Sequence, residues 1–490
     1  MVIGAMCAPF ERVALYRFED LYASAPIDRL FGSGVDAGSL HGTAVSRALD
    51  VLFGADLEDL SWKCSEACIG RFGLESTMYH IDATNVSVYA ITENVDIEGA
   101  PAAMYGGNSK TGRNDLRQYD AMSVADGNRV LRYLKAYSGN TSDTVMDAET
   151  IEFLKSRIDP GTSTIVADSK LLSEDIVSEL IGIKAGFISK CPRNFSGKVR
   201  ETIELSVKDS FMERSRLGAG YGVYDTDAET EFGTLRFIAY KTPSDLESSL
   251  EYFRDQGERI LSKSFAQVRK RRFSCPTDAR SAVQSIIEKM GDVAYDIEYD
   301  VVSCEERVRR SKRGRPPKGS AAPDARTYWR VDMSWSFDAD LAVSLAKRDE
   351  IQVLVTNIPR ANEDAENIRF GATADTVVRC YLDEYKPEHL FRLLKSGLGR
   401  DKVFLHRGSR VAAMMFIAGL AGTLLSVMDE LLRRGNADIS TYRMKLQLYD
   451  TTVRLKRQTG YMYIDGHPGA GMEIQNYCRI FNLDPDKLLG

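Results

Sequence analysis

The sequence predicts an α/β protein whose core is a mixed β-sheet with flanking helices, and two observations support this class. Between residues 76 and 191 the hydrophobic pattern reads strand, strand, strand, helix, strand, helix, strand. The last two strands each follow a helix, as parallel strands usually do, whereas the first three are close enough in sequence for an antiparallel meander. This order is that of the ribonuclease H-like fold.

Each element of this core has its own signal. The segment "STMYHIDATNVSVYA" is rich in β-forming residues, and "DLRQYDAMSVADGNRVLRYLKAYSG" reads as two strands joined by a turn at residues 126–128. A helix follows, for which Thr141 or Ser142 is the expected N-cap. The remaining elements are a buried strand, a helix and a strand, in "TSTIVADS", "LLSEDIVSELIGI" and "AGFISKC".

Other regions flank or interrupt the core. Residues 192–376 alternate apolar and polar residues in several segments, for example "AYDIEYDVVS" and "TYWRVDMSWSFD", which predicts a β-rich insertion with helical excursions. The full predicted division is a helical N-terminal region, the first part of the core, the insertion, the second part of the core and a helical C-terminal region, at residues 1–75, 76–191, 192–376, 377–430 and 431–490.

Composition narrows the class of protein. The chain has 490 residues, 43% of them hydrophobic, and a net charge of −6, so it can bury several cores but has no overall basic excess. Its eight cysteines are scattered, which favours free thiols in a reducing cytoplasm, and the N-terminus does not resemble a signal peptide. The 18 uncharged residues 411–428 include many small residues and predict a buried core helix rather than a membrane span.

The basic residues are clustered locally. Residues 307–318 contain seven Lys or Arg, followed by small residues and proline, and this segment cannot pack a core. One interpretation is a solvated loop. The other is a loop that lies on DNA phosphates, with Arg313 and Arg315 able to enter a narrow minor groove.

Three carboxylates could form one site. Asp82 ends "YHID" in the first strand, Asp168 ends the fourth strand, and Glu388 lies on a later helical segment. In the ribonuclease H-like order the first and fourth strands are neighbours, so we expect the two aspartates to meet. Like charges that close raise each other's pKa unless a cation neutralises them. Oxygen ligands select hard divalent ions, so we predict Mg²⁺ or Mn²⁺ and two-metal chemistry at a phosphodiester.

A resemblance makes this prediction more specific. The segment "YLDEYKPEHLFRLLKSGLGR" resembles the Tyr-x-x-Arg-x-x-x-Glu-x-x-x-x-x-x-Lys signature of insertion-sequence DDE transposases, and Tyr381, Glu388 and Lys395 match it at the correct spacing. Glu384 stands where the family has arginine. Because Pro387 precedes the glutamate, we expect the helix to begin there and to leave Tyr381 on a preceding turn.

Further segments resemble the same family in the same order along the chain. "HIDATNVSVY" and "TIVADSKLLSEDIVSELI" resemble the surroundings of its two aspartates, and "NSKTGRNDLRQYDAMSVADG" with "SGNTSD" resembles the stretch between them. "IQVLVTNIP" resembles the strand that returns from the family's β-rich insertion. The resemblance covers about residues 40–430.

The resemblance implies a DNA transposase that cleaves at element ends and transfers strands to target DNA. In this reading Asp82, Asp168 and Glu388 bind the catalytic Mg²⁺ or Mn²⁺, and Tyr381 and Lys395 contact the phosphate backbone of the element end. The implied partners are double-stranded DNA, as terminal inverted repeats and target, and a second copy of the chain in a synaptic complex. We expect the protein in the cytoplasm, associated with the nucleoid. Two alternatives stay open: a DNA-binding remnant that has lost catalysis, and a Mg²⁺-dependent nuclease that does not join strands.

Overall fold

The computed structural model forms two compact units, of which the first comprises Met1–Ser206, Tyr224–Ile238 and Val353–Gly490 and the second Val207–Val223 and Ala239–Gln352. The structure describes residues 2–7, 17–23, 27, 34–35, 37–88, 97–105, 115–192, 195–196, 199–208, 213–214, 217–218, 221–241, 246–307, 325–349, 351–383, 405–437, 439–453, 455–458, 461–464 and 470–483.

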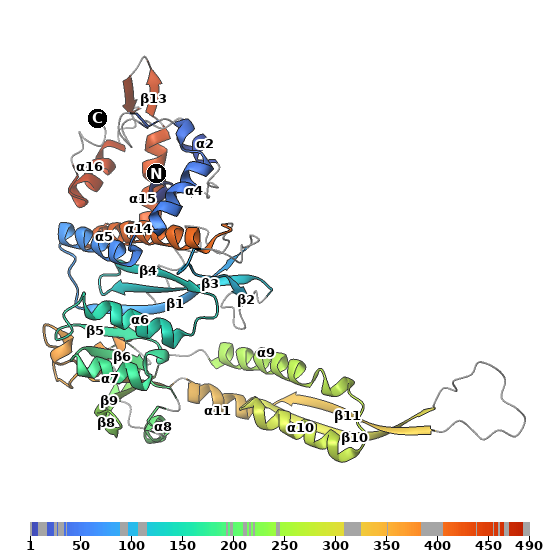
Figure 1. Cartoon of the computed structure of the whole chain (residues 1–490). Helices are drawn as coiled ribbons and strands as arrows, with labels where there is room; N and C mark the ends of the chain where they lie inside the picture. The colour runs from blue at the N-terminus through green and yellow to red at the C-terminus, as the bar shows by residue number, and fades with distance from the viewer. Residues whose placement is uncertain are drawn as a thin grey trace, which may run out of the picture. The chain divides into compact units, whose positions relative to one another are not determined.

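A ten-stranded mixed sheet forms the centre of the fold (Figure 1). Its strands follow the order β2-β3-β1-β5-β6-β12-β9-β8-β7, and β4 pairs with β3. The strands are β1 (Met78–Val88), β2 (Met104–Tyr105), β3 (Arg117–Asp126), β4 (Leu131–Ser138), β5 (Thr164–Ala167), β6 (Gly186–Lys190), β7 (Glu213–Arg214), β8 (Gly222–Thr230), β9 (Gly233–Lys241) and β12 (Ile351–Thr356).

Five of these strands have the ribonuclease H-like arrangement. β4, β3 and β1 pair antiparallel in that spatial order, and β1, β5 and β6 then pair parallel. The first, second and third strands of the core therefore form a meander, and the fourth strand lies beside the first. This mixed α/β architecture confirms the fold class predicted from the sequence.

The local signals act as expected in this core. The turn between β3 and β4 is closed by the carboxylate of Asp126, which accepts hydrogen bonds from the backbone N–H groups of Asn128 (2.9 Å) and Val130 (3.0 Å). Ser142, rather than Thr141, is the N-cap of α6 (Asp143–Lys155), because its hydroxyl accepts a hydrogen bond from the Val145 N–H at 3.4 Å.

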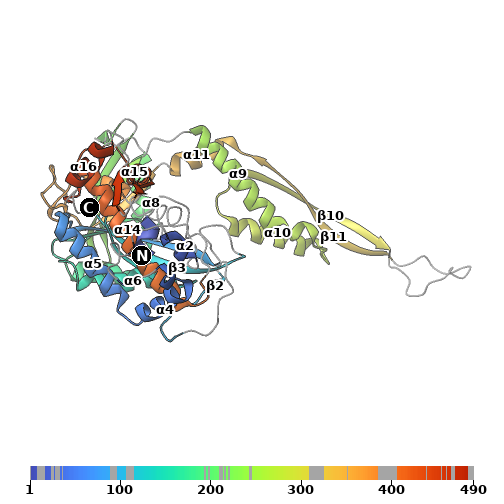
Figure 2. The ribbon, with the colours of Figure 1, turned by 90° about the horizontal axis from the view of Figure 1, so that it is seen from above.

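Helices cover both faces of the meander. Val86 and Val88 of β1 pack with Met415 and Ala418 of α14 (Gly408–Arg434) in one hydrophobic cluster. On the opposite face, the rings of Tyr133 in β4 and Phe153 in α6 lie 4.5 Å apart. α14 also contacts α4 (Gly42–Phe53) and α5 (Leu57–Phe72), as Figures 1 and 2 show. The core of the sheet is thus enclosed between α6 and the α14 layer.

α14 contains the apolar segment 411–428. Within the described part of the chain it is the one helix long and apolar enough to cross a membrane, and 67% of its most apolar window is buried inside the protein. Val411, Ala413 and Leu425 are each at most 2% exposed. This burial agrees with the core helix predicted from the sequence.

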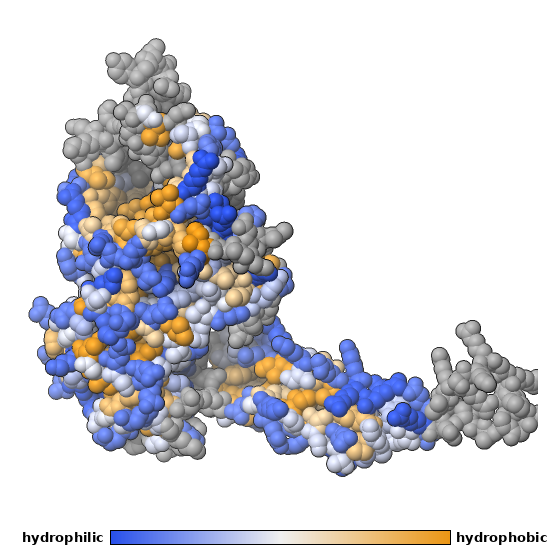
Figure 3. Space-filling view, in the orientation of Figure 1, coloured by the Kyte–Doolittle hydropathy of each residue, from blue (hydrophilic) through white to orange (hydrophobic). Residues whose placement is uncertain are grey.

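The second unit is built on a hairpin of β10 (Tyr295–Arg307) and β11 (Ala325–Phe337), which pair antiparallel along their full lengths. Leu261 and Phe265 of α9 (Leu246–Phe265) and Val283 of α10 (Pro276–Met290) pack against Val331 and Met333 of the hairpin. α11 (Ala339–Asp349) follows the hairpin. Hydrophilic residues cover much of the face of this unit drawn in Figure 3, with apolar residues between them.

The predicted insertion, residues 192–376, contains two kinds of structure. β8, β9 and β12 belong to the central sheet, whereas α9, α10, α11 and the long hairpin form most of the second unit. The helices α10 and α11 were not located from the sequence. The outer boundaries of the insertion stay a prediction, and Arg313 and Arg315 of the basic segment lie outside the described residues.

Most of the remaining elements lie near the two ends of the chain. The exceptions are α7, which lies between β5 and β6, α8, which follows β6, and α12, which follows β12. The described N-terminal residues are mainly helical, and the C-terminal region adds a small hairpin to its helices. The elements are α1 (Val2–Cys7), α2 (Phe18–Tyr22), η2 (Ala37–Ser39), α7 (Glu174–Gly182), α8 (Val199–Lys208), α12 (Ala374–Leu382), α15 (Thr441–Val453), β13 (Leu455–Gln458), β14 (Tyr461–Ile464) and α16 (Ala470–Ile480).

Candidate active site

Two of the predicted carboxylates lie on neighbouring parallel strands, Asp82 within β1 and Asp168 directly after β5. The ladder between β1 and β5 ends at the pair His80 and Val166. Continuing this register by two residues places Asp168 opposite Asp82. Asp82 is half-buried in β1, and Asp168 is exposed directly after β5. The structure therefore pairs the first and fourth strands, as the sequence predicts, and both aspartates lie just beyond the last pair of their ladder.

Hydrogen bonds to the backbone fix the position of Asp168. Its carboxylate caps η3 (Ser169–Leu171) by accepting a hydrogen bond from the Lys170 N–H at 2.7 Å. Its backbone carbonyl accepts a hydrogen bond from the Ser189 hydroxyl in β6 at 2.6 Å. On the neighbouring strand, the carbonyl of Asp82 accepts one from the Ser123 hydroxyl at 3.3 Å. Both aspartates are thus held by rigid sheet and helix backbone rather than by a loop.

Sequence analysis missed a further carboxylate, Asp147. This residue lies in α6, is 4% exposed and has a pKa raised from its ordinary value of 3.8 to about 7. Burial is the largest cause, followed by the charges of Asp168 and Asp143, with a smaller contribution from Asp82 and an opposing one from Lys170. The signal in the sequence was its spacing, because Asp147 follows Asp143 by four residues and so shares a face of the helix.

The raised pKa of Asp147 gives a pH-dependent prediction. Between about pH 4 and about pH 7 the folded protein holds a proton on Asp147 that the unfolded chain has released, so stability falls as pH rises through this window. Asp147→Asn removes this penalty. We expect the variant to raise the free energy of unfolding by roughly 2–4 kcal/mol at pH 8 and by close to zero at pH 4.

Chemical denaturation at the two pH values measures this difference. Glu149→Gln is a suitable control on the same helix, because Glu149 is exposed and its ion pair with Lys135 is a surface pair, which should contribute at most about 1 kcal/mol. An equal gain at pH 4 and pH 8 would contradict the assignment, since it would not depend on ionisation of Asp147.

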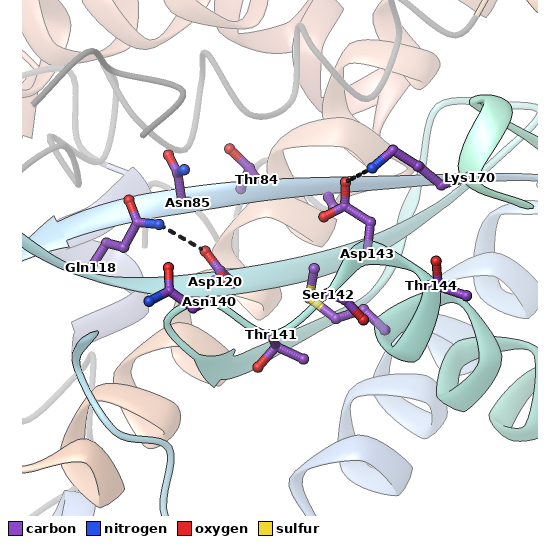
Figure 4. A pocket seen from close by; sticks show the side chains of 12 residues that line it. Thr84, Asn85, Gln118, Asp120, Asn140, Thr141, Ser142, Asp143, Thr144 and Lys170 are labelled. Carbon is purple, nitrogen blue, oxygen red and sulfur yellow. Dashed lines mark hydrogen bonds and ion pairs between the residues drawn. The ribbon is translucent and has the colours of Figure 1, made fainter. Parts of the chain in front are cut away.

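A polar pocket of about 570 Å³ lies beside these carboxylates (Figure 4). Strands β1 and β3 and the first turn of α6 line it, together with Lys170. The Lys170 ammonium pairs with the carboxylate of Asp143 at 3.3 Å, and the Gln118 amide donates a long hydrogen bond of 3.5 Å to Asp120. The Asn85 side-chain oxygen is buried, and no group in the described part of the chain donates a hydrogen bond to it. Polar groups thus extend from the aspartates into an accessible cavity.

Tyr381 lies in the last turn of α12, so the expectation that it sits on a turn outside a helix is wrong. α12 begins after Thr373, whose hydroxyl accepts a hydrogen bond from the Thr376 N–H at 3.3 Å, whereas the helix expected to begin at Pro387 lies outside the described residues. Val377 and Val378 are completely buried, and α12 contacts β5 and β6. Burial of these valines holds α12 against the sheet.

The other predicted site residues lie outside the described residues. These are Glu388 and Lys395, with the two arginines of the basic segment, Arg313 and Arg315. Glu384 and Pro387 also lie outside them. The roles predicted for all of these residues stay predictions.

The described residues supply two of the three predicted metal ligands. Within the described ranges, no three His, Cys, Asp or Glu side chains come together as one metal-binding group. The donor set nevertheless suits a hard divalent ion, because Asp82 and Asp168 offer carboxylate oxygens and their charges, with that of Asp143, raise the pKa of Asp147. Negative charge concentrated in this way favours the binding of a cation between the aspartates.

Comparisons with known proteins add a distant structural similarity. No protein-family model and no curated protein matches the chain. The chain is similar to a piggyBac transposase in the cryo-EM structure of its synaptic complex with hairpin DNA, with 11% sequence identity and a TM-score of 0.36. The match covers 84% of this chain and 59% of that chain. The ribonuclease H-like order of the core is given by the strand pairing itself.

Proposed function

We propose that this protein is the DNA transposase of an insertion sequence, which cleaves phosphodiester bonds at the element ends and joins the ends to target DNA. The observation that carries this proposal is the placement of Asp82, within β1, and Asp168, directly after β5, just beyond the last pair of the parallel ladder between these strands. The resemblance of several ordered sequence segments to DDE transposases supports it.

Asp82 and Asp168 would hold Mg²⁺ or Mn²⁺ together with Glu388. When bound, these ions activate a water or a 3′-hydroxyl and stabilise the leaving oxygen. The chain's own contribution is to hold Asp82 within β1 and Asp168 directly after β5, where the Lys170 N–H and the Ser189 hydroxyl orient Asp168. Such preorganisation reduces the rearrangement that the site must undergo during reaction.

The proposed partners are the terminal inverted repeats of the element and a target duplex. Tyr381 and Lys395 would contact the phosphate backbone of the element end, and Arg313 and Arg315 would lie on flanking DNA. Two element ends must be held together for transposition, so we propose a homodimer in the synaptic complex. The proposed location is the cytoplasm, on nucleoid DNA.

A cleavage and joining assay tests this function. The full chain is incubated with labelled DNA that carries the inverted repeats flanking its gene, together with an unlabelled target plasmid, in Mg²⁺ or in EDTA. We expect nicks at the repeat ends and labelled joined product in Mg²⁺, and neither product in EDTA.

The same assay separates the alternatives. Nicked DNA without joined product would replace the transposase assignment with that of a nuclease. DNA binding without cleavage would indicate a catalytically lost remnant, and Glu384→Arg then asks whether the family's arginine restores activity. Absence of both binding and cleavage would overturn the proposal.

A further inference from the structure

The connector between β12 and α12, residues 357–373, is held by side chains that bond to backbone groups at the start of β6. The Asn357 side-chain oxygen accepts a hydrogen bond from the Phe187 N–H at 2.9 Å. The Arg369 guanidinium donates to the Lys184 carbonyl at 2.9 and 3.0 Å. The connector is thus fixed against the amino end of β6.

Arg236 of β9 joins the two ends of this connector. Its side chain is 4% exposed, and its Nη1 donates to the carbonyls of Ala372 at 2.8 Å, Pro359 at 3.2 Å and Ile358 at 3.4 Å. The other side of the guanidinium donates to both carboxylate oxygens of Asp225 in β8, at 3.0 and 2.7 Å. All of these residues belong to the first unit. One planar group therefore ties both ends of the connector to β8 and β9.

Asp225 strengthens this tie through a second arginine. Its carboxylate also accepts a hydrogen bond from Arg360 of the connector at 3.0 Å, and Arg360 pairs with Asp227 at 3.1 Å. Burial would raise the pKa of Asp225, but the hydrogen bonds from Arg236 and Arg360 lower that pKa below its ordinary value. The carboxylate therefore stays ionised and keeps both guanidinium groups in place.

The end of the connector that Arg236 holds is the start of α12. Ala372 directly precedes Thr373, the N-cap, and Tyr381 lies in the last turn. A helix rises about 1.5 Å per residue, so Tyr381 lies roughly 12 Å from the cap, and a tilt of about 5° at the start would move it by about 1 Å. A displacement of about 1 Å can slow an enzymatic step about 100-fold.

Stability alone does not account for an arginine at this position. Replacing a buried ion pair by apolar side chains of similar volume is often neutral or stabilising. A guanidinium differs from such side chains because it is planar and donates in fixed directions. Arg236 therefore sets the orientation of the connector's two ends relative to Asp225 as well as their distance from it.

We propose that Arg236 is a positioning residue of the candidate active site, which fixes the start of α12 and thereby places Tyr381 for contact with the DNA phosphate backbone. The proposal rests on the DNA-processing function above and on the role proposed there for Tyr381. Arg236 itself does not touch DNA in this proposal. It acts through the connector and the helix that follows.

A kinetic experiment with the full chain tests this role. The DNA carries the inverted repeats that flank the gene, and single-turnover nicking with excess protein gives the maximal rate and the protein concentration at half that rate. Arg236→Lys keeps a positive charge beside Asp225, but an ammonium lacks the planar fork that reaches both Asp225 and Ala372. We expect its maximal rate to fall about 10- to 100-fold, with the half-maximal concentration changed less than about 2-fold.

A double-mutant cycle assigns the effect to Tyr381. Tyr381→Phe removes the hydroxyl that we propose contacts DNA. If Arg236 acts by placing this hydroxyl, Arg236→Lys should slow the Tyr381→Phe variant by no more than about 3-fold. A disturbance elsewhere in the protein would instead slow both backgrounds by the same factor.

Two further variants control for folding, and thermal melting is measured for each. Asp225→Asn keeps the size of the side chain and one acceptor oxygen, so it loosens Arg236 more mildly and should slow nicking about 3- to 10-fold with the same non-additivity. Arg434→Lys is the matched control, because Arg434 also joins a carboxylate, that of Glu430, to a backbone carbonyl, the one that follows α5. We expect this control to nick at the parental rate.

The outcomes separate this role from the proposed function. A parental nicking rate in folded Arg236→Lys, an effect on the half-maximal concentration alone, or equal slowing in the Tyr381→Phe background would overturn the positioning role while leaving the transposase function intact. If Arg236→Lys does not fold, Asp225→Asn decides by the same criteria. A parent chain that does not nick the DNA would overturn the positioning role and the proposed function together.

Discussion

Asp168→Asn is expected to lower the rate of metal-dependent DNA cleavage by at least about 10³-fold, equivalent to roughly 4 kcal/mol of transition-state stabilisation. The asparagine keeps the size of the side chain and an oxygen that can cap η3, so the backbone around β5 should be preserved. It removes one negative charge from the group that includes Asp82 and Asp147. The folded state should therefore be slightly more stable without divalent ions, while cleavage is lost.

The measurements are initial rates on the nicking substrate, affinity for the same DNA in EDTA, and thermal melting. Asp175→Asn is the control, because Asp175 is an exposed carboxylate in the first turn of α7. We expect this control to cleave at the parental rate. A cleaving Asp168→Asn variant would exclude Asp168 from the active site, and a variant that melts much earlier would indicate a structural role.

Among the variants considered for stability, Arg132→Ala is expected to lower the free energy of unfolding most, by about 3–5 kcal/mol. The Arg132 side chain is 2% exposed, lies 3.6 Å from the completely buried Asp126 carboxylate, and donates to the Ser65 hydroxyl at 3.1 Å. Its guanidinium also stacks on the Trp62 ring, 4.2 Å from the ring centroid. Removing it leaves a cavity and a buried carboxylate without its cation.

The pH dependence of this loss identifies its cause. Burial already raises the pKa of Asp126 to about 7, so at pH 5 that carboxyl is neutral in the folded protein. Loss of the arginine's positive charge then costs less free energy than it does when the carboxyl is ionised. The loss in Arg132→Ala should be smaller at pH 5 than at pH 8, and the double variant with Asp126→Asn should recover part of it at pH 8. Denaturation curves give these values.

The control for this prediction is Arg71→Ala, an exposed arginine in the last turn of α5, for which we expect a change within about 0.5 kcal/mol. A loss below about 1 kcal/mol in Arg132→Ala would show that water replaces the guanidinium and that this buried pair contributes little.

Local patterns predicted the core well because each strand and helix there has its own strong signal. The alternation of β-forming residues, the turn at Asp126 and the cap at Ser142 each depend on neighbours a few residues away. The same patterns located the hairpin strands but not α10 and α11, although both helices have the apolar and polar faces of amphipathic helices.

The tryptophans and basic residues of the second unit show how packing changes an interpretation. Four consecutive basic residues, 269–272, would by charge alone be expected in solvent. The Arg269 guanidinium nevertheless lies 4.2 Å from the centroid of the Trp335 ring and donates to the Met333 carbonyl at 2.9 Å. Charge in the sequence gave no sign of this partner, because the contact joins residues more than sixty positions apart.

The sequence by itself determined the order of the core elements and the identity of Asp82 and Asp168 as candidate ligands, because strand order and residue type are properties of the chain. Only the tertiary structure decided that Asp147 belongs beside them. Its importance comes from burial and from charges on other elements, and its raised pKa does not exist until α6 packs on the sheet.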